Sequence, residues 1–294
     1  MDNRMRKRPS QGRSRVTVTS ILEAADRILR ADGYEAASTN RVARVAGFSV
    51  GSLYQYFSDK QAIVGALIDR ELRTEAEALA QLLDQEARRG AVELASEGFR
   101  MLVTRRASRA HLHRTLDAHA AELGASGIVE HLVAAQSPVL SDTLQRIGAQ
   151  SLPRSSRSLD ARMFALARLA TAASFVCAVE APQVFTSDAL RAEFAVAVER
   201  FLNGPPPRPA TVTLALNWAK PSGSGTAPEQ RARRRREARG VLLAAEVDPA
   251  ALEARTFLLA NLADVAHATQ RAPYGLTQED LLHEVARFAE ALGA

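Results

Sequence analysis

The sequence predicts an all-α fold. Aromatic residues make up only 5% of the 294 residues, and such scarcity beside abundant Ala, Leu and Arg favours closely packed helices over strands. Apolar residues recur at three- and four-residue spacing along much of the chain, the period of an amphipathic helix. A hydrophobic share of 47% and a charged share of 24% are those of a globular protein with a substantial core. Length and composition thus exclude a fibre, a peptide and a small disulfide scaffold.

Cysteine usage and hydropathy indicate where the protein works. The single cysteine, Cys177, cannot form an internal disulfide or a Cys-rich metal site, which fits a reducing compartment. Apolar runs fall short of the ~18 to 20 residues that span a bilayer. We therefore expect a cytoplasmic protein with no membrane partner.

Positive charge is concentrated at the start of the chain. Six Lys or Arg residues stand against one acid between residues 1 and 15, within a net charge of +5 for the whole chain. Residues 1–15 are predicted to be a flexible basic arm. The arm either contacts a polyanion or is simply a solvated terminus.

Local signals place three helices between residues 16 and 60. The first is predicted over about 17–32 and ends at Gly33. The second covers about 39–46, with Ser38 or Thr39 as its N-cap and a buried face formed by Val42, Val45 and Ala46.

A tight turn, Gly47-Phe48-Ser49, then buries Phe48 and leads into a third helix over 50–56. Leu53 and Phe57 face inward, and the outward face carries small, polar and aromatic residues, namely Val50, Gly51, Ser52, Gln55 and Tyr56. Ser58 and Gln61 have the spacing of a capping box that opens a long helix. Two short helices joined by a tight turn form a helix-turn-helix, whose second helix fits the DNA major groove.

The segment that carries this pattern closely resembles the TetR family of bacterial transcriptional regulators. The resemblance rests on Thr39-Asn40-Arg41-Val42-Ala43, on the run AGFSVGSLYQYFSDK over residues 46–60 and on Gly33-Tyr34. It covers about residues 16–65. It implies double-stranded operator DNA as the partner and an N-terminal DNA-binding domain over 16–65.

The resemblance also assigns roles to single residues. Thr39, Tyr54, Tyr56 and Lys60 would contact phosphates, with Ser52 and Gln55 as weaker candidates. Asn40, Val50 and Gly51 would approach base edges, because Asn suits adenine, Val suits a thymine methyl group and Gly admits close backbone approach. The complete predicted DNA-binding set is Thr39, Asn40, Arg41, Ser49, Val50, Gly51, Ser52, Tyr54, Gln55, Tyr56 and Lys60. Arg4, Arg6, Arg8, Arg13 and Arg15 of the arm could lie in a minor groove or along phosphates.

Residues 66–203 are predicted to form a second, helical domain. Its helices are expected at about 60–89, 91–107, 110–123, 126–149, 158–181 and 187–202, separated by Gly and Pro signals. The domain loosely resembles the ligand-binding and dimerisation domain of the same family. That resemblance implies a homodimer through about 158–202, a near-palindromic operator and release by a small-molecule effector of unknown identity.

The sequence gives little support to metal binding or catalysis. His111, His113, Asp117, His119 and His131 crowd one region, but their spacing does not complete a metal site, so we expect no metal and no cofactor. G-x-G-x-x-G, P-loop and H-E-x-x-H motifs are missing, so we expect no enzyme activity. The alternatives to a repressor are a sequence-tolerant architectural DNA-binding protein and an activator of the same fold.

The last 90 residues depart from the family pattern. Residues 204–240 read as a Pro/Gly/Arg-rich linker. Little fixed structure is expected over 205–228, where Thr211 to Trp218 alternates weakly like a strand. A dense run of Arg residues over 231–239 either binds DNA backbone or solvates the start of a helix.

Residues 241–294 are predicted to be a helical tail. Leu252 to Ala263 lines up with Leu159 to Ala170, and Thr277 to Leu292 resembles Thr186 to Phe201, which indicates a second copy of the dimerisation helix pair. The copy could extend a dimer bundle, cap the first pair within its own subunit or build a higher oligomer. Chance similarity between two Ala/Leu/Arg-rich helices is the alternative.

Overall fold

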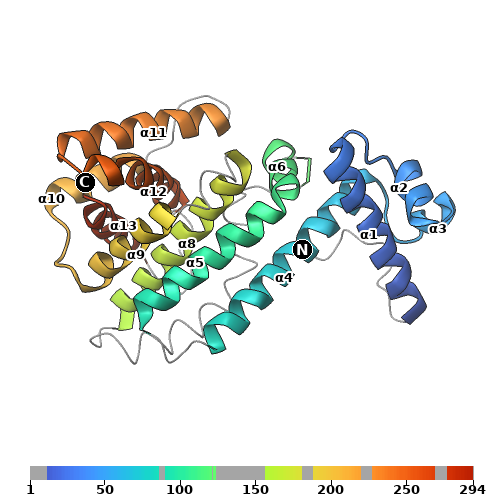
Figure 1. Cartoon of the computed structure of the whole chain (residues 1–294), viewed down its shortest axis with the longest axis horizontal. Coiled ribbons are helices and arrows are strands. Elements are labelled where there is room, and N and C mark those ends of the chain that lie inside the picture. The colour runs from blue at the N-terminus through green and yellow to red at the C-terminus, as the bar shows by residue number, and fades with distance from the viewer. Residues whose placement is uncertain are drawn as a thin grey trace. The chain divides into compact units, whose positions relative to one another are not determined.

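A computed structural model describes residues 12–85, 90–120, 122–123, 156–180, 188–219, 227–268 and 277–293 (Figure 1). Every regular element in these ranges is a helix, which confirms the predicted all-α fold. The chain divides into two compact units. The N-terminal unit comprises residues 1–76 and 108–135, and the C-terminal unit comprises residues 77–107 and 136–294.

The N-terminal unit holds a bundle of short and long helices. Its elements are α1 (Gly12–Asp32), α2 (Thr39–Ala46), α3 (Val50–Tyr54), the first part of α4 (Lys60–Gln85) and α6 (Ala110–Ala118). Helix α1 packs on α2 and on α6, and α2 packs on α3. The core side chains that are at most 2% exposed include Ile21, Leu53, Phe57, Ile63, Leu112 and Leu116.

Local caps fix the ends of these helices as the sequence predicts. Ser38 is the N-cap of α2, and its side chain accepts a hydrogen bond from the backbone N–H of Arg41. Gly33 and Gly47 follow α1 and α2 with φ of 80° and 77°, the left-handed conformation that favours glycine. Ser49 caps α3 by accepting from the N–H of Ser52.

Two predicted helix starts are wrong. Helix α1 begins at Gly12 rather than at about 17, so Arg13 and Arg15 belong to a helix and not to a flexible arm. Residues 13–17 contain no Gly or Pro, and the helix extends by backbone hydrogen bonding on the N-terminal side of Val18, its first buried position. Arg4, Arg6 and Arg8 lie outside the described residues. At the start of α4 the cap is Asp59, whose Oδ1 accepts from the N–H of Ala62 at 2.7 Å, and not Ser58.

Three predicted orientations near the turn also differ. Val45, predicted to be core, is 40% exposed, because α2 is covered along Val42 and Ala43 and Val45 lies about 200° around the helix from Ala43. Tyr56, predicted to face outward, is only 9% exposed. Helix α3 ends at Tyr54, so Tyr56 lies in the following turn and points inward beside Phe57. Phe48 is half-buried rather than buried.

The C-terminal unit is a larger helical bundle. Besides the last part of α4 it contains α5 (Ala91–Ser108), α8 (Ser156–Glu180), α9 (Asp188–Asn203), α10 (Pro209–Ala219), α11 (Ala227–Ala244), α12 (Pro249–Ala268) and α13 (Gln278–Ala291). Helices α12 and α13 pack against each other, and each of them packs on both α8 and α9. Helix α10 packs on α12 and α13, and α11 packs on α12 (Figure 1).

Aromatic pairs mark the core of this unit. The rings of Phe99 and Phe194 stack with centroids 4.1 Å apart, and those of Phe201 and Phe288 lie 4.7 Å apart. Cys177 is buried on α8, and this burial raises the pKa of its thiol, which keeps it protonated and unreactive.

The predicted helices of the second domain are found with small changes in their ends. The segment predicted at 110–123 is helical only to Ala118, and the helix predicted at 126–149 lies outside the described residues. No helix in the described part of the chain is long and apolar enough to cross a membrane. The domain boundaries predicted at 65, 203 and 240 stay predictions, since the compact units are defined by packing alone.

The prediction of little fixed structure is wrong for residues 209–219, as is the strand over Thr211 to Trp218, and residues 220–226 lie outside the described part of the chain. Residues 209–219 form α10 and residues 227–244 form α11. In α10 the buried residues Thr211 and Ala215 are four apart, while Thr213 between them is exposed. A strand would bury residues 211, 213 and 215 alike. The observed burial has the period of a helix, although the sequence alternates weakly like a strand. Pro209 stands at the first helical position, where its missing N–H has no cost.

Candidate nucleic-acid interface

The turn between α2 and α3 is held by backbone bonds and buried anchors. The N–H of Phe48 donates to the carbonyl of Ala43 at 3.0 Å, and the N–H of Gly47 donates to the carbonyl of Arg44 at 3.2 Å. Leu53 on α3 and Val42 on α2 are fully buried. The orientation of α3 relative to α2 is therefore fixed by the core, whatever its outer side chains contact.

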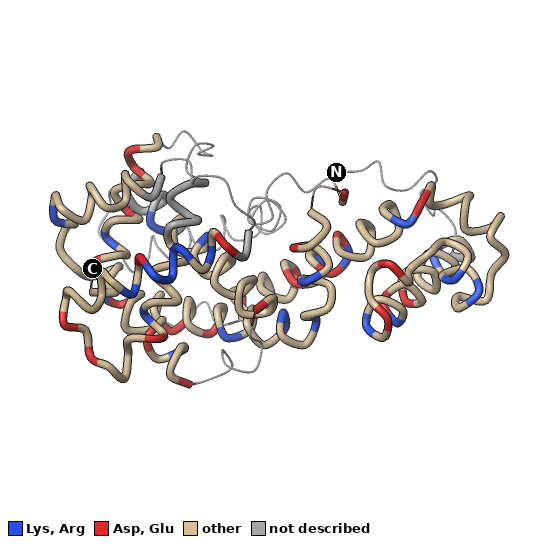
Figure 2. The backbone as a smooth tube through the Cα atoms, turned by 90° about the horizontal axis from the view of Figure 1, so that it is seen from above, with Lys and Arg blue, Asp and Glu red and all other residues tan. Residues whose placement is uncertain are grey.

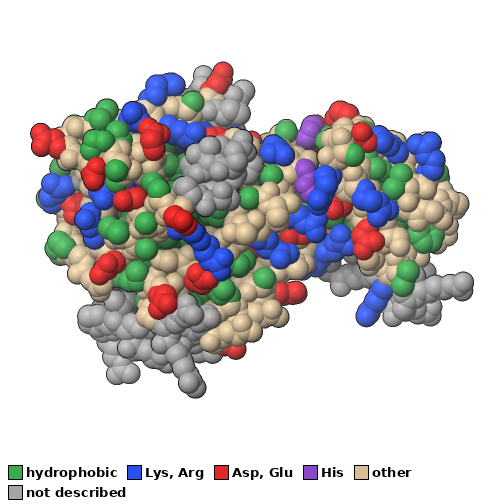
Figure 3. All heavy atoms as spheres, viewed as in Figure 1, with side chains coloured by type: hydrophobic (Ala, Val, Ile, Leu, Met, Phe, Trp, Pro, Cys, Tyr) green, Lys and Arg blue, Asp and Glu red, His purple; other side chains and the backbone are tan. Residues whose placement is uncertain are grey.

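The outer surface of this motif, which we call the α2–α3 face, presents most of the residues predicted to bind DNA. Asn40, Ser49, Gly51, Tyr54 and Gln55 are exposed, whereas Thr39, Arg41, Val50, Ser52 and Lys60 are half-buried. Tyr54 is 41% exposed. Tyr56 is the member of the set that the fold buries. Figure 3 shows Lys and Arg side chains on the visible surface of the N-terminal unit.

Hydroxyl pairs position the polar groups of the α2–α3 face. Thr39 Oγ1 lies 3.2 Å from the hydroxyl of Tyr54, which joins the first residue of α2 to the last residue of α3. Ser49 Oγ lies 2.8 Å from Ser52 Oγ. A hydroxyl both donates and accepts, so each pair is preorganised and keeps bonding capacity for a phosphate oxygen.

The cations next to this face already have acidic partners. Arg41 pairs with Asp32. Lys60 Nζ lies 3.1 Å from Glu35 and 3.9 Å from the centroid of the Tyr34 ring. A phosphate bound by Lys60 or Arg41 would therefore replace or share a carboxylate. Exposed Arg44 on α2 is a further basic candidate that sequence reasoning missed, although it stands on the same short helix.

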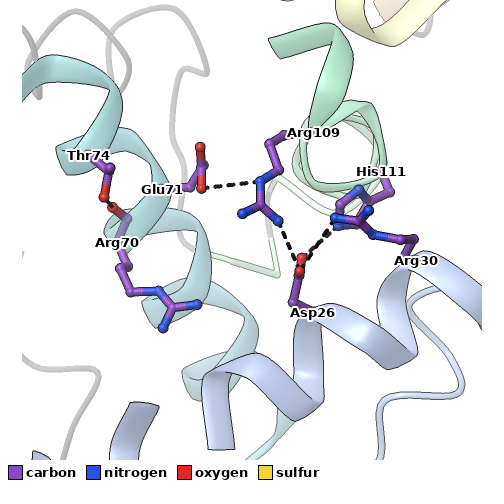
Figure 4. Close-up of polar contacts among 7 residues, drawn as sticks. All are labelled: Asp26, Arg30, Arg70, Glu71, Thr74, Arg109 and His111. Atoms are coloured by element: carbon purple, nitrogen blue, oxygen red, sulfur yellow. Dashed lines mark hydrogen bonds and ion pairs between the residues drawn. The ribbon is translucent and has the colours of Figure 1, made fainter. Parts of the chain in front are cut away.

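An ionic network connects α1 with α6 and α4 (Figure 4). Asp26 on α1 lies 2.7 Å from His111 Nε2 on α6 and 2.9 Å from Arg109 Nη1. Arg109 Nε in turn lies 3.6 Å from Glu71 on α4. The hydrogen bond from His111 is the largest cause that holds the pKa of Asp26 below its ordinary value. The network fixes the helix that precedes the DNA-binding motif against α6.

A second contact ties the loop after α1 to the turn after α6. The Tyr34 ring stacks on His119 with centroids 3.9 Å apart, and its hydroxyl donates to Glu122 at 3.3 Å. Burial, followed by the charge of Glu122, raises the pKa of Tyr34 to about 12. Because Lys60 also lies over this ring, one buried tyrosine contacts both α4 and the segment after α6.

These contacts account for most of the histidines that the sequence groups together. His111 pairs with Asp26, His119 stacks on Tyr34, and His113 is buried in α6. His131 lies outside the described residues. Within the described ranges, His, Cys, Asp and Glu side chains form no group of three or more that could hold a metal ion.

Taken together, a short helix, a glycine turn and a second short helix with a small polar face define a helix-turn-helix DNA-binding domain. Residues 21–67 match the family model of the bacterial regulatory proteins of the tetR family. The N-terminal helix-turn-helix is therefore of the TetR type, and the protein is a TetR-like DNA-binding transcriptional regulator. A search of curated proteins gave no match to the chain.

Proposed function

We propose that the protein is a transcriptional repressor of the cytoplasm that binds operator DNA through the α2–α3 face and is released by a small-molecule effector. The observation that carries the proposal is the preorganised face itself. Helix α3 is anchored by the fully buried Leu53, and paired hydroxyls surround it. Preorganisation of this kind lowers the cost of ordering side chains on DNA.

The roles of the individual residues follow from their exposure. We assign Asn40, Val50 and Gly51 to base edges and assign the phosphate contacts to the remaining surface residues, namely Thr39, Arg41, Ser49, Ser52, Tyr54, Gln55 and Lys60. Because Tyr56 is buried, we assign it a packing role beneath the face in place of a phosphate contact.

The network around Asp26 supports coupling between an effector and DNA. Helix α4 belongs to both compact units, and Glu71 on α4 and His111 on α6 are joined through Arg109 and Asp26 to α1. A ligand that shifts α4 or α6 would therefore change the contacts that hold α1. Linkage makes the effect reciprocal, so operator DNA would weaken effector binding by the same factor.

The Arg run of α11 does not favour the architectural alternative. Several of its Arg side chains pair with carboxylates: Arg231 and Arg235 with Glu180, Arg233 with Glu237 and Arg239 with Glu253. Figure 2 marks Lys and Arg and also Asp and Glu along the backbone, and both kinds of residue occur in each compact unit. An arginine held by a carboxylate contributes less to phosphate binding, because the pair must first be separated.

The packing of α8 and α9 does not support the homodimer predicted through 158–202. Helices α12 and α13 of the same chain already pack against them. We therefore assume neither a single half-site nor an inverted repeat, and the selection of DNA described next decides the form of the operator.

The test is selection of sheared genomic DNA by the purified full chain at physiological salt, followed by sequencing. We expect a few sites that share one motif, and we expect Asn40→Ala to lose them while the fold is retained. Recovery of unselected DNA would contradict a specific regulator. A reporter gene placed behind a recovered site then decides between repression and activation.

A further inference from the structure

The two copies of the repeated sequence form two helix pairs of the same chain. The first copy lies in α8 and α9, and the second lies in α12 and α13. Each helix of one pair packs on both helices of the other pair. The four helices thus form one bundle, in which the second pair covers the first.

Reciprocal ion pairs relate the two copies. Arg162 and Arg255 hold the same position in the repeated segments, three residues after Leu159 and Leu252, and Glu193 and Glu284 each follow their Thr by seven residues. Arg162 Nε lies 3.2 Å from Glu284, and Arg255 Nε lies 2.7 Å from Glu193. Each pair crosses from one copy to the other.

The arginines repeat a second contact as well. Arg162 donates to the carbonyl of Leu202 at 3.3 Å, and Arg255 donates to the carbonyl of Leu292 at 3.5 Å. Both carbonyls lie at the end of the second helix of the arginine's own pair. Such an exchange, in which residue i contacts j and the copy of j contacts the copy of i, is the signature of a two-fold interface.

Burial shows that α8 is already covered within a single chain. Every residue of α8 from 168 to 178 is buried, as expected for a central helix with neighbours on all sides. In this unit the exposed large apolar side chains of the described residues are Val196, Leu216 and Leu243. They lie on three different helices, and isolated apolar side chains of this kind do not mark an interface.

Connecting segments hold the second pair in place. Arg287 on α13 donates to the carbonyls of Gly204 and Pro205, directly after α9. Glu290 on α13 accepts from the backbone N–H of Arg208 and from the hydroxyl of Thr211. Because a tethered segment has an effective concentration of about the millimolar range, the tail competes strongly with any second copy in solution.

We infer that α12 and α13 are an internal copy of the α8–α9 pair that occupies, within the same chain, the surface on which a second subunit would dock. The C-terminal unit is then a two-fold bundle built from one chain, with one helix-turn-helix per bundle. The pairing itself is independent of the proposed function. Only its consequence, that one chain reads one half-site, rests on that function.

A charge exchange tests whether the pairing is within one chain. Glu193→Arg places two arginines together and should lower Tm on the order of 5 °C. Adding Arg255→Glu to the same chain should restore most of the loss. Glu199→Arg, an exposed position on the same helix, is the matched control and should change Tm little.

Mixing distinguishes pairing within a chain from exchange between chains. Chains with Glu193→Arg alone, mixed and refolded with chains carrying Arg255→Glu alone, should show no restoration, and the Tm of the unaltered chain should not depend on protein concentration. Restoration on mixing would overturn the inference. A loss for Glu193→Arg no larger than for Glu199→Arg would overturn it too, since the crossed pairs would then be without effect.

Discussion

At the scale of single residues, the α2–α3 face depends on side chains that contribute little to the core. Gly51 is the clearest case. A Cβ added there would meet only Ser49 Oγ, at 3.9 Å, so the fold has room for a larger residue. A requirement for glycine at this position would come from DNA and not from packing.

We therefore predict that Gly51→Ala leaves the fold intact and weakens specific DNA binding. Alanine is the better helix former, so the free energy of unfolding should stay the same or rise by up to about 1 kcal/mol. Binding to a selected site should fall, because the methyl group keeps α3 from the base edges. Fluorescence anisotropy and denaturation measure the two effects, with Gly240→Ala on α11, also open to a Cβ, as the control. Unchanged affinity would remove Gly51 from the readout.

The lowered pKa of Asp26 predicts how the stability of the fold depends on pH. Its pKa in the folded protein lies below the ordinary value of 3.8, chiefly because His111 donates a hydrogen bond to it. A depressed carboxyl pKa stabilises the fold above the unfolded pKa, and this contribution is lost as pH falls through the folded pKa. Asp26→Asn should therefore cost roughly 1 to 3 kcal/mol near neutral pH, and the difference should shrink below about pH 4. Urea denaturation at several pH values measures it. A cost that stays constant down to acid pH would contradict the assignment.

The raised pKa of Tyr34 predicts that stability is lost at high pH. Its pKa is raised from 10.0 to about 12, so the stability it contributes is complete below pH 10 and is lost as pH rises through 12. Ultraviolet titration of the full chain should show one late tyrosine that is missing in Tyr34→Phe. If a late phenol persists in that variant, the raised pKa does not belong to Tyr34.

At the scale of elements, caps and turns formed by near neighbours in the sequence are predictable, whereas long-range contacts are not. Ser38, Ser49, Gly33 and Gly47 fix helix ends through their own backbone neighbours, so the sequence predicts those ends correctly. Asp26 and His111 are 85 residues apart, and nothing local says which partner each side chain finds. The burial of Tyr56 is unpredictable for a related reason, since the orientation of the residues just after a short helix depends on the core beneath it. The exposed residues of the α2–α3 face could be named from the sequence, but the acidic partners of Lys60 and Arg41 could not.

Two neighbouring residues of α10 test whether this segment is a helix. Ala215 is fully buried, whereas its neighbour Leu216 is 48% exposed. Ala215→Asp should therefore destabilise the protein by roughly 3 kcal/mol or more, because a charge is buried without a partner. Leu216→Asp should change stability by less than about 0.5 kcal/mol. Thermal denaturation of the two variants makes the comparison, and equal effects would argue against the helix.

At the scale of the whole molecule, the covered bundle determines how many chains act together. Removal of residues 205–294 takes away α10 to α13 and uncovers the apolar side of α8. We expect the shortened chain to self-associate, either as a dimer or as larger species, while the full chain does not do so through this surface. Light scattering after gel filtration measures both masses. A shortened chain that stays monomeric and as stable as the full chain would show that the tail is dispensable.

The duplicated helix pair also changes which substitutions this bundle can accept. In a symmetric dimer each substitution appears on both sides of the axis and must be compatible with its own image. Here the two halves are encoded separately, and they already differ: Arg168 of the first copy corresponds to Asn261 of the second, whose amide donates to the carbonyl of Phe257. Each half can therefore diverge alone, so one side of the bundle is free to acquire a new specificity while the other preserves the scaffold.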